Sequence, residues 1–126
     1  MLTDITFCAS KPSERSYEQK PDATYVQGET VWMYLEAFKF HYTEEELMFV
    51  AAFDTTLEVY DSEGAFIDEM KDYMEIPSSE KPVYMWFRFW IDTGDFKEGH
   101  YTVRITMTDA SGDQAQTEGT FSVVSR

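Results

Sequence analysis

The chain has 126 residues, 43% of them hydrophobic and 17% aromatic, so it is large and apolar enough to bury a core without a metal or a disulfide. Its formal net charge of -14 argues against binding to nucleic acid or to anionic lipid, because both are negatively charged. The single cysteine, Cys8, excludes an intramolecular disulfide, and no apolar stretch is long enough to span a membrane. The length fits one domain, residues 1–126.

The first forty residues predict two strands and a long connection between them. A short strand is expected over residues 5–9. Residues 11–22 contain two prolines and many polar groups, which is typical of a surface connection. After a turn at Gly28, residues 31–38 alternate with a period of two, and this pattern predicts a second strand.

Residues 43–60 allow two interpretations. Thr43 and Glu46 have the spacing of a helix capping box, so the apolar residues 47–52 could begin a short helix. The alternative is a strand, and it is supported by apolar residues that share one parity: Phe49, Ala51, Phe53, Leu57 and Val59. We favour a strand that runs to Tyr60, followed by a tight turn at residues 61–64 and a return strand from residue 65.

The C-terminal third gives the clearest pattern. Residues 83–91 are apolar on both faces, as expected for a central strand. Residues 100–108 alternate strictly, a polar turn follows at residues 109–113, and alternation resumes to Val123. About seven strands and no long helix predict an all-β fold, an immunoglobulin-like antiparallel β-sandwich.

Residues 99–124 resemble the last two strands of prokaryotic surface immunoglobulin-like modules of the polycystic-kidney-disease-repeat type. The matching residues are Gly99, Tyr101, Val103, Ile105, Asp109, Ser111, Gly112, Phe121 and Val123. The resemblance implies an immunoglobulin-like fold, an extracytoplasmic setting and a tyrosine corner at Tyr101, whose hydroxyl would bond to upstream backbone. The Trp-Asp-Phe-Gly-Asp-Gly-like motif of those repeats is missing here, so the resemblance assigns no functional residues.

Polar residues show no catalytic or metal-binding spacing. His41 and His100 lie far apart and belong to no zinc or triad motif, and Cys8 is expected to be an apolar filler in the first strand. Several acidic residues lie near predicted turns, where turn formation explains them better than calcium binding: Asp61, Glu63, Asp92, Asp95, Asp109 and Asp113. We therefore predict a protein that is not an enzyme, with no catalytic residue, no metal and no cofactor.

Outward-facing aromatic rings form the candidate binding site. If residues 31, 33 and 35 face the core, the rings between them face outward, and the same reasoning applies to residues 83–91. The predicted binding residues are Trp32, Tyr34, Tyr84, Trp86 and Trp90. Since monomers rarely expose such a large apolar patch, a cover is expected. It could be residues 66–76, a partner domain, or a flat ligand such as a sugar.

These observations favour an adhesion, spacer or interaction module of a surface or secreted protein, located outside the cell or at its surface. Its expected partner is another protein or a neighbouring domain. A cytosolic binding or inhibitor protein is the alternative, because residues 1–4 do not resemble a signal segment. A carbohydrate-binding module that uses the outer aromatic face is the third possibility.

Overall fold

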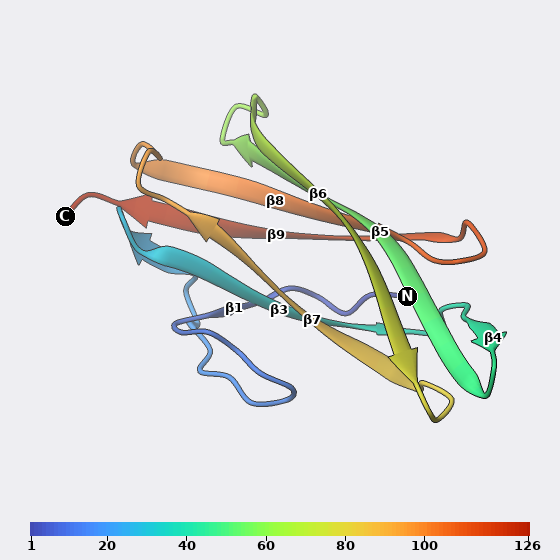
Figure 1. Ribbon diagram of the computed structural model, residues 1–126. Coiled ribbons are helices and arrows are strands. Elements are labelled where there is room, and N and C mark those ends of the chain that lie inside the picture. The colour runs from blue at the N-terminus through green and yellow to red at the C-terminus, as the bar shows by residue number, and fades with distance from the viewer.

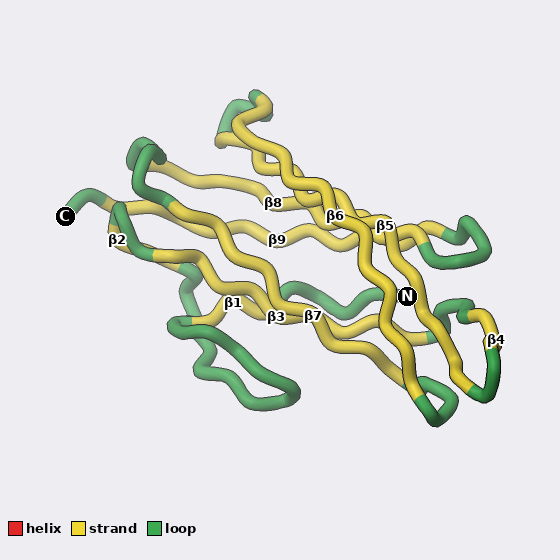
Figure 2. Tube along the Cα trace, viewed as in Figure 1, coloured by secondary structure: helices red, strands yellow, loops and turns green.

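Nine β-strands and no helix make up the computed structural model, which describes residues 1–126 (Figures 1 and 2). The strands are β1 (Thr6–Cys8), β2 (Thr24–Val26), β3 (Thr30–Phe38), β4 (Thr43–Glu45), β5 (Met48–Asp61), β6 (Phe66–Ser78), β7 (Tyr84–Asp92), β8 (Gly99–Thr108) and β9 (Gln114–Val124). One sheet has the order β1-β3-β7, and the other has the order β2-β9-β8-β5-β4, with β6 paired to β5. The predicted all-β sandwich is confirmed.

The strand count and one pairing differ from the sequence-based expectation. There are nine strands rather than about seven, because β2 and β4 each add three residues that are too short to show an alternating pattern. The sheet is not purely antiparallel, because β2 runs parallel to β9 and pairs Tyr25 with Val123. The immunoglobulin-like assignment stays a prediction.

The ambiguous segment around residue 45 forms a β-hairpin. Thr43–Glu45 pairs with the start of β5, so the capping-box spacing does not begin a helix. Glu46 and Leu47 make the turn between the two strands with φ values of 42° and 72°. Strand β5 then continues unbroken to Asp61, as the shared parity of its apolar residues predicted.

The core lies between the two sheets and is filled by the apolar residues that alternate along each long strand. In β3 the buried positions include Val31, Met33 and Leu35, and β8 contributes Val103 and Ile105. Aromatic contacts join the layers: the ring centroids of Phe53 on β5 and Phe87 on β7 lie 5.3 Å apart, and those of Phe7 on β1 and Phe121 on β9 lie 6.1 Å apart. The alternation of apolar residues with a period of two therefore predicted correctly which side chains of these strands are buried.

The predicted tyrosine corner is present at the start of β8. The Tyr101 hydroxyl donates a hydrogen bond to the Lys97 carbonyl oxygen at 2.5 Å. The Tyr101 ring stacks on Phe121 of β9, with centroids 5.5 Å apart. This contact fixes the turn that leads into the C-terminal hairpin.

The two termini lie toward opposite ends of the sandwich (Figure 1). The N-terminal ammonium donates to the Phe38 carbonyl oxygen at the end of β3, whereas Arg126 bonds the Gln27 carbonyl oxygen just before β3 begins. None of the secondary-structure elements is a helix capable of crossing a membrane.

Candidate binding surface

The five predicted aromatic residues lie together on the outer face of the β3–β7 pair. The register places Trp32 opposite Trp90, and the inward residues beside them, such as Val31 and Ile91, are buried in the core. Successive side chains point to opposite faces, so the aromatic set faces outward. The ring centroids of Trp32 and Trp90 are 5.9 Å apart, and those of Tyr34 and Trp86 are 6.2 Å apart in a stacked arrangement.

Residues 10–18, here called the covering loop, connect β1 toward β2 and contact Tyr34 and Tyr84 on this outer face (Figure 2). The Tyr17 ring lies 4.8 Å from the Tyr34 ring, and the Arg15 guanidinium lies 3.9 Å from the centre of the Tyr84 ring. Tyr34 is consequently only 4% exposed. Residues 66–76, one of the possible covers, form β6 in the other sheet and do not lie over the face. They reach only its edge, where Met70, Met74 and Ile76 line a hollow together with Trp86 and Trp90.

A polar cluster holds the covering loop at the middle of the face. Glu36 Oε2 accepts a hydrogen bond from the Tyr34 hydroxyl at 2.6 Å and pairs with Arg15 Nε at 3.1 Å. The Arg15 main-chain amide also donates to the Tyr34 hydroxyl at 3.0 Å. The bond from Tyr34, helped by the one from Arg15, outweighs burial and lowers the pKa of Glu36. Burial, together with the Glu36 carboxylate, raises the pKa of Tyr34 to about 12.

Two further contacts attach the covering loop to β7. The Tyr84 hydroxyl donates to Glu14 Oε2 at 2.6 Å, and Arg88 Nη1 donates to the Pro12 carbonyl oxygen at 3.2 Å. Two of the predicted binding residues, Tyr34 and Tyr84, therefore have their hydroxyls engaged within the chain. These side chains serve the attachment of the loop.

The end of the face that the covering loop leaves open carries Trp32 and Trp90. Trp90 is 52% exposed, and Trp32 is half-buried. Their ring planes are tilted by 46° to each other, so the pair does not form a flat platform. Trp90 is the one exposed ring of the five predicted residues, and this end of the face, defined by Trp32 and Trp90, is open to contact.

Cys8 is a structural residue beneath the same loop. Its side chain has no exposed surface, and burial raises the pKa of its thiol to about 11. A thiol with this pKa carries almost no thiolate at neutral pH, and the thiolate is the nucleophilic form. The Cys8 carbonyl oxygen accepts a bond from the buried Tyr25 hydroxyl at 2.9 Å.

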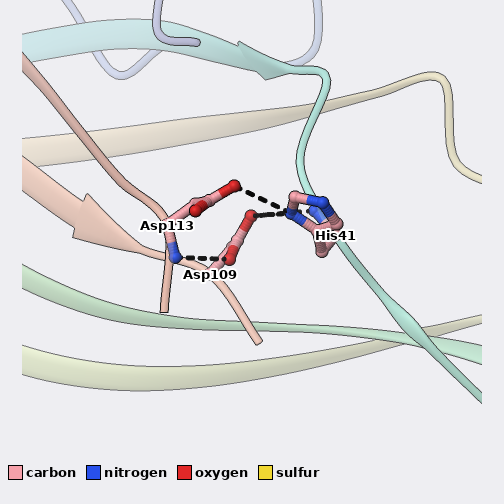
Figure 3. A group of neighbouring side chains, drawn as sticks. All are labelled: His41, Asp109 and Asp113. Atoms are coloured by element: carbon pink, nitrogen blue, oxygen red, sulfur yellow. Dashed lines mark hydrogen bonds and ion pairs between the residues drawn. The ribbon is translucent and has the colours of Figure 1, made fainter. Parts of the chain in front are cut away.

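A polar cluster at the other end of the sandwich was not found by sequence reasoning (Figure 3). His41 Nδ1 lies 2.9 Å from Asp109 Oδ2 and 3.3 Å from Asp113 Oδ2. Ser111 Oγ lies 3.0 Å from the same nitrogen. Nothing in the sequence signals this meeting, because His41 follows β3 whereas the aspartates belong to the β8–β9 turn.

Hydrogen bonds control the charge in this cluster. Burial alone would raise the pKa of Asp109, but bonds from the His41 main-chain amide, the His41 ring and Ser111 outweigh it and lower the pKa far below its usual range. The bond to Asp109 in turn raises the pKa of His41. His41, Asp109 and Asp113 are the only group whose ligand atoms converge as metal ligands would, and His41 already contacts both carboxylates.

The remaining acidic turn residues lie at the end of the sandwich away from His41. Asp61, Glu63, Asp92 and Asp95 line an open hollow of about 810 Å³ there. They do not meet within the spacing of a cation site. Asp61 and Asp92 instead accept hydrogen bonds from nearby main-chain amides, as residues in turns commonly do.

Comparison with known proteins gives structural likenesses but no match of sequence. No protein-family model matches the sequence, and no curated protein matches it. The C-terminal domain of Wzt, a solved structure, is similar with a TM-score of 0.59 at 9% sequence identity. The match covers 98% of this chain and 73% of that chain. At this identity the likeness shows the shared β-sandwich fold.

Proposed function

We propose that this chain is a non-enzymatic binding module that contacts a protein partner or a neighbouring domain through Trp32 and Trp90. The observation that carries the proposal is the half-exposed Trp90 ring beside Trp32, at the one end of the aromatic face that the covering loop leaves open. Tryptophan is enriched among residues that dominate binding energy, because a rigid ring offers a large contact area at little entropic cost.

The geometry of the open end favours a protein surface over a sugar ring. A flat ring stacks best on a flat aromatic platform, but Trp32 and Trp90 are tilted by 46°. The stacked pair, Tyr34 and Trp86, lies in the part of the face where Tyr34 is buried under the covering loop. Carbohydrate binding is therefore the second candidate, and it would rest on the exposed Trp90 ring alone.

The polar groups of the face support a role without catalysis. Glu36, Tyr34 and Arg15 are bonded to one another, and their bonds attach the covering loop. The pKa of Glu36 is lowered, so it is a poor proton acceptor at neutral pH. The thiol of Cys8 is buried and protonated. No converging set of unoccupied polar groups is left on this face to act as acid, base or nucleophile.

The setting is proposed to be a surface or secreted protein. This rests on the resemblance of residues 99–124 to surface immunoglobulin-like modules. The fold is also shared with a domain that occupies the C-terminal part of a larger protein, as expected for a module used within longer chains.

The proposal is tested by comparing Trp90→Ala with Tyr73→Ala. Tyr73 is a matched control, since it is 54% exposed but lies on β6 in the other sheet. Surface and secreted proteins of the source cells would be captured on the native domain, and each candidate would then be purified and titrated. We expect Trp90→Ala to weaken binding about tenfold or more while Tyr73→Ala leaves it unchanged.

A partner that binds the two variants equally would contradict the proposal. Binding of a purified oligosaccharide that depends on Trp90, with no protein partner found, would establish the second candidate instead. Trp86→Ala serves as the stability reference, because Trp86 packs within the face. This substitution should lower the free energy of unfolding by an amount approaching the loss of about 3–5 kcal/mol that is known for large core truncations.

A further inference from the structure

A second apolar surface lies beside Trp90, in the groove between β6 and β7. The groove is a hollow of about 270 Å³ lined by ten residues: Thr55, Met70, Asp72, Met74, Ile76, Trp86, Phe87, Arg88, Phe89 and Trp90. Five of these are consecutive in β7. Because neighbours in a strand point to opposite faces, a hollow lined by five consecutive residues runs along the edge of that strand.

The edge of β7 in this groove is free to pair with another strand. β7 is hydrogen-bonded only to β3, and no side chain caps the main chain between Trp86 and Trp90. β6, on the opposite wall, is protected differently. The carboxylates of Asp68 and Asp72 accept hydrogen bonds from the next main-chain amides, at 2.8 Å and 2.9 Å. An unpaired strand edge is a template for an added strand, so β7 is the edge that can accept one.

A buried polar group in the groove lacks a partner. Thr55 is 4% exposed, and its Oγ1 is the one buried side-chain polar atom that makes no hydrogen bond. Leaving a buried hydroxyl unpaired destabilises the free protein, and a ligand that reaches it removes that cost. Thr55 also lies opposite Asp72 in the β5–β6 register. These two polar side chains interrupt the apolar lining of the groove.

We infer that this groove binds an extended peptide segment of a protein partner, which adds a strand to the edge of β7. Alternate apolar side chains of the segment would pack against Met70, Met74 and Ile76. Basic side chains would be attracted to Asp72, which lines the groove, and to Asp68, which by register lies on the same face of β6. The inference rests on the proposed function and names the kind of segment that the partner supplies.

Charge decides against a second copy of this chain as the occupant. Each copy carries a formal net charge of -14, so two copies would repel each other. Size argues against an enclosed small molecule, because pockets for such ligands usually measure about 300–1,000 Å³ and are closed on more sides. An extended basic and apolar segment satisfies the free edge, the apolar wall and the charge together.

The experiment uses the whole chain and a blocked synthetic peptide of about seven residues that alternates valine and lysine. Binding would be followed by tryptophan fluorescence, and amide hydrogen exchange would be measured along Trp86–Trp90. We expect saturable binding and slower exchange at this edge. A peptide with proline at the central valine lacks the required amide, and an alternating valine–glutamate peptide has the wrong charge; neither should bind.

Two matched variants place the peptide on the groove. Met70→Lys and Tyr73→Lys add the same charge to β6, but by register Met70 faces the groove and Tyr73 faces away from it. Met70→Lys should weaken binding of the valine–lysine peptide about tenfold or more, and Tyr73→Lys should change it far less.

Equal weakening by both variants, or equal binding of the proline peptide, would overturn the inference, because either result indicates general charge attraction. Absence of peptide binding would overturn it too. Concentration-dependent dimerisation in ultracentrifugation, lost in Met70→Lys, would show a second copy instead. If the peptide experiment fails, the proposed function still stands provided that a partner protein binds, that Trp90→Ala weakens this binding, and that Met70→Lys does not.

Discussion

Arg15 Nε lies 3.1 Å from Glu36 Oε2, and this ion pair joins the turn of the covering loop to the centre of the outer face. The two side chains differ in environment, because Arg15 is 58% exposed whereas Glu36 is 12% exposed. The loop is thus held by polar bonds at the solvent boundary, over aromatic rings that would otherwise be open. This relationship determines how much of the aromatic face is available for contact.

Arg15→Ala should loosen the covering loop without unfolding the domain. It removes the bonds to Glu36 and the contact with the Tyr84 ring, so the stacked rings of Tyr34 and Trp86 become accessible. We expect faster proteolysis within residues 10–18 and increased quenching of tryptophan fluorescence by acrylamide. Lys11→Ala is the control, since Lys11 is exposed and forms no ion pair. Identical proteolysis of the two variants would show that Arg15 does not hold the loop.

Thr55→Val should stabilise the protein. Valine has nearly the shape of threonine but lacks the hydroxyl, which is buried and unpaired in Thr55. Removing an unsatisfied buried group should raise the free energy of unfolding by about 1 kcal/mol. Urea denaturation measures this change, with the unfolding slope checked to be unchanged. A loss of stability would mean that the hydroxyl is paired in solution.

The contribution of the His41 cluster to the stability of the fold should decrease as the pH rises. Because Asp109 raises the pKa of His41 in the folded state, protonated His41 stabilises the fold. This contribution is fully present below the ordinary histidine pKa of about 6.5, and it is lost as the pH rises through the higher folded value.

The corresponding measurement compares the native protein with His41→Gln by thermal unfolding from pH 6 to pH 9. The difference in melting temperature should be largest at pH 6 and should shrink as the pH rises. Titration of the His41 ring by NMR should give a pKa above the ordinary value. A pH-independent difference between the two proteins would contradict the assignment of a charged pair.

Tyr101→Phe should lower stability by removing one hydrogen bond while keeping the ring. The hydroxyl bonds the Lys97 carbonyl oxygen, and the ring remains stacked on Phe121. The expected loss is about 1 kcal/mol, the usual net value of one such bond. Tyr60→Phe provides a control at a half-buried pair with Glu58 and should have a smaller effect, because Tyr101 is more deeply buried. An equal loss of stability in Tyr101→Phe and Tyr60→Phe would show that the hydrogen bond of the tyrosine corner contributes no more than an ordinary side-chain bond.

The alternation of apolar residues was sufficient to predict the long strands and the faces they bury. Val31 and Met33 on β3, and Val103 and Ile105 on β8, are core residues as the pattern indicated. The tyrosine corner was expected from the resemblance of residues 99–124 to surface immunoglobulin-like modules, and its bond to Lys97 spans only four residues. Local chemistry and a period of two carry this information without knowledge of the rest of the chain.

The availability of the aromatic face was decided by the tertiary structure. That Trp32 and Trp90 face outward follows from parity, but whether the face is covered depends on Arg15 meeting Glu36 across 21 residues of sequence. The same holds for His41 and Asp109, which are 68 residues apart, and for the groove between β6 and β7, whose walls belong to different sheets. Sequence periodicity records which side of its own strand a residue occupies. It carries no information about which distant loop or edge comes to lie against that side, because this depends on the packing of the whole chain.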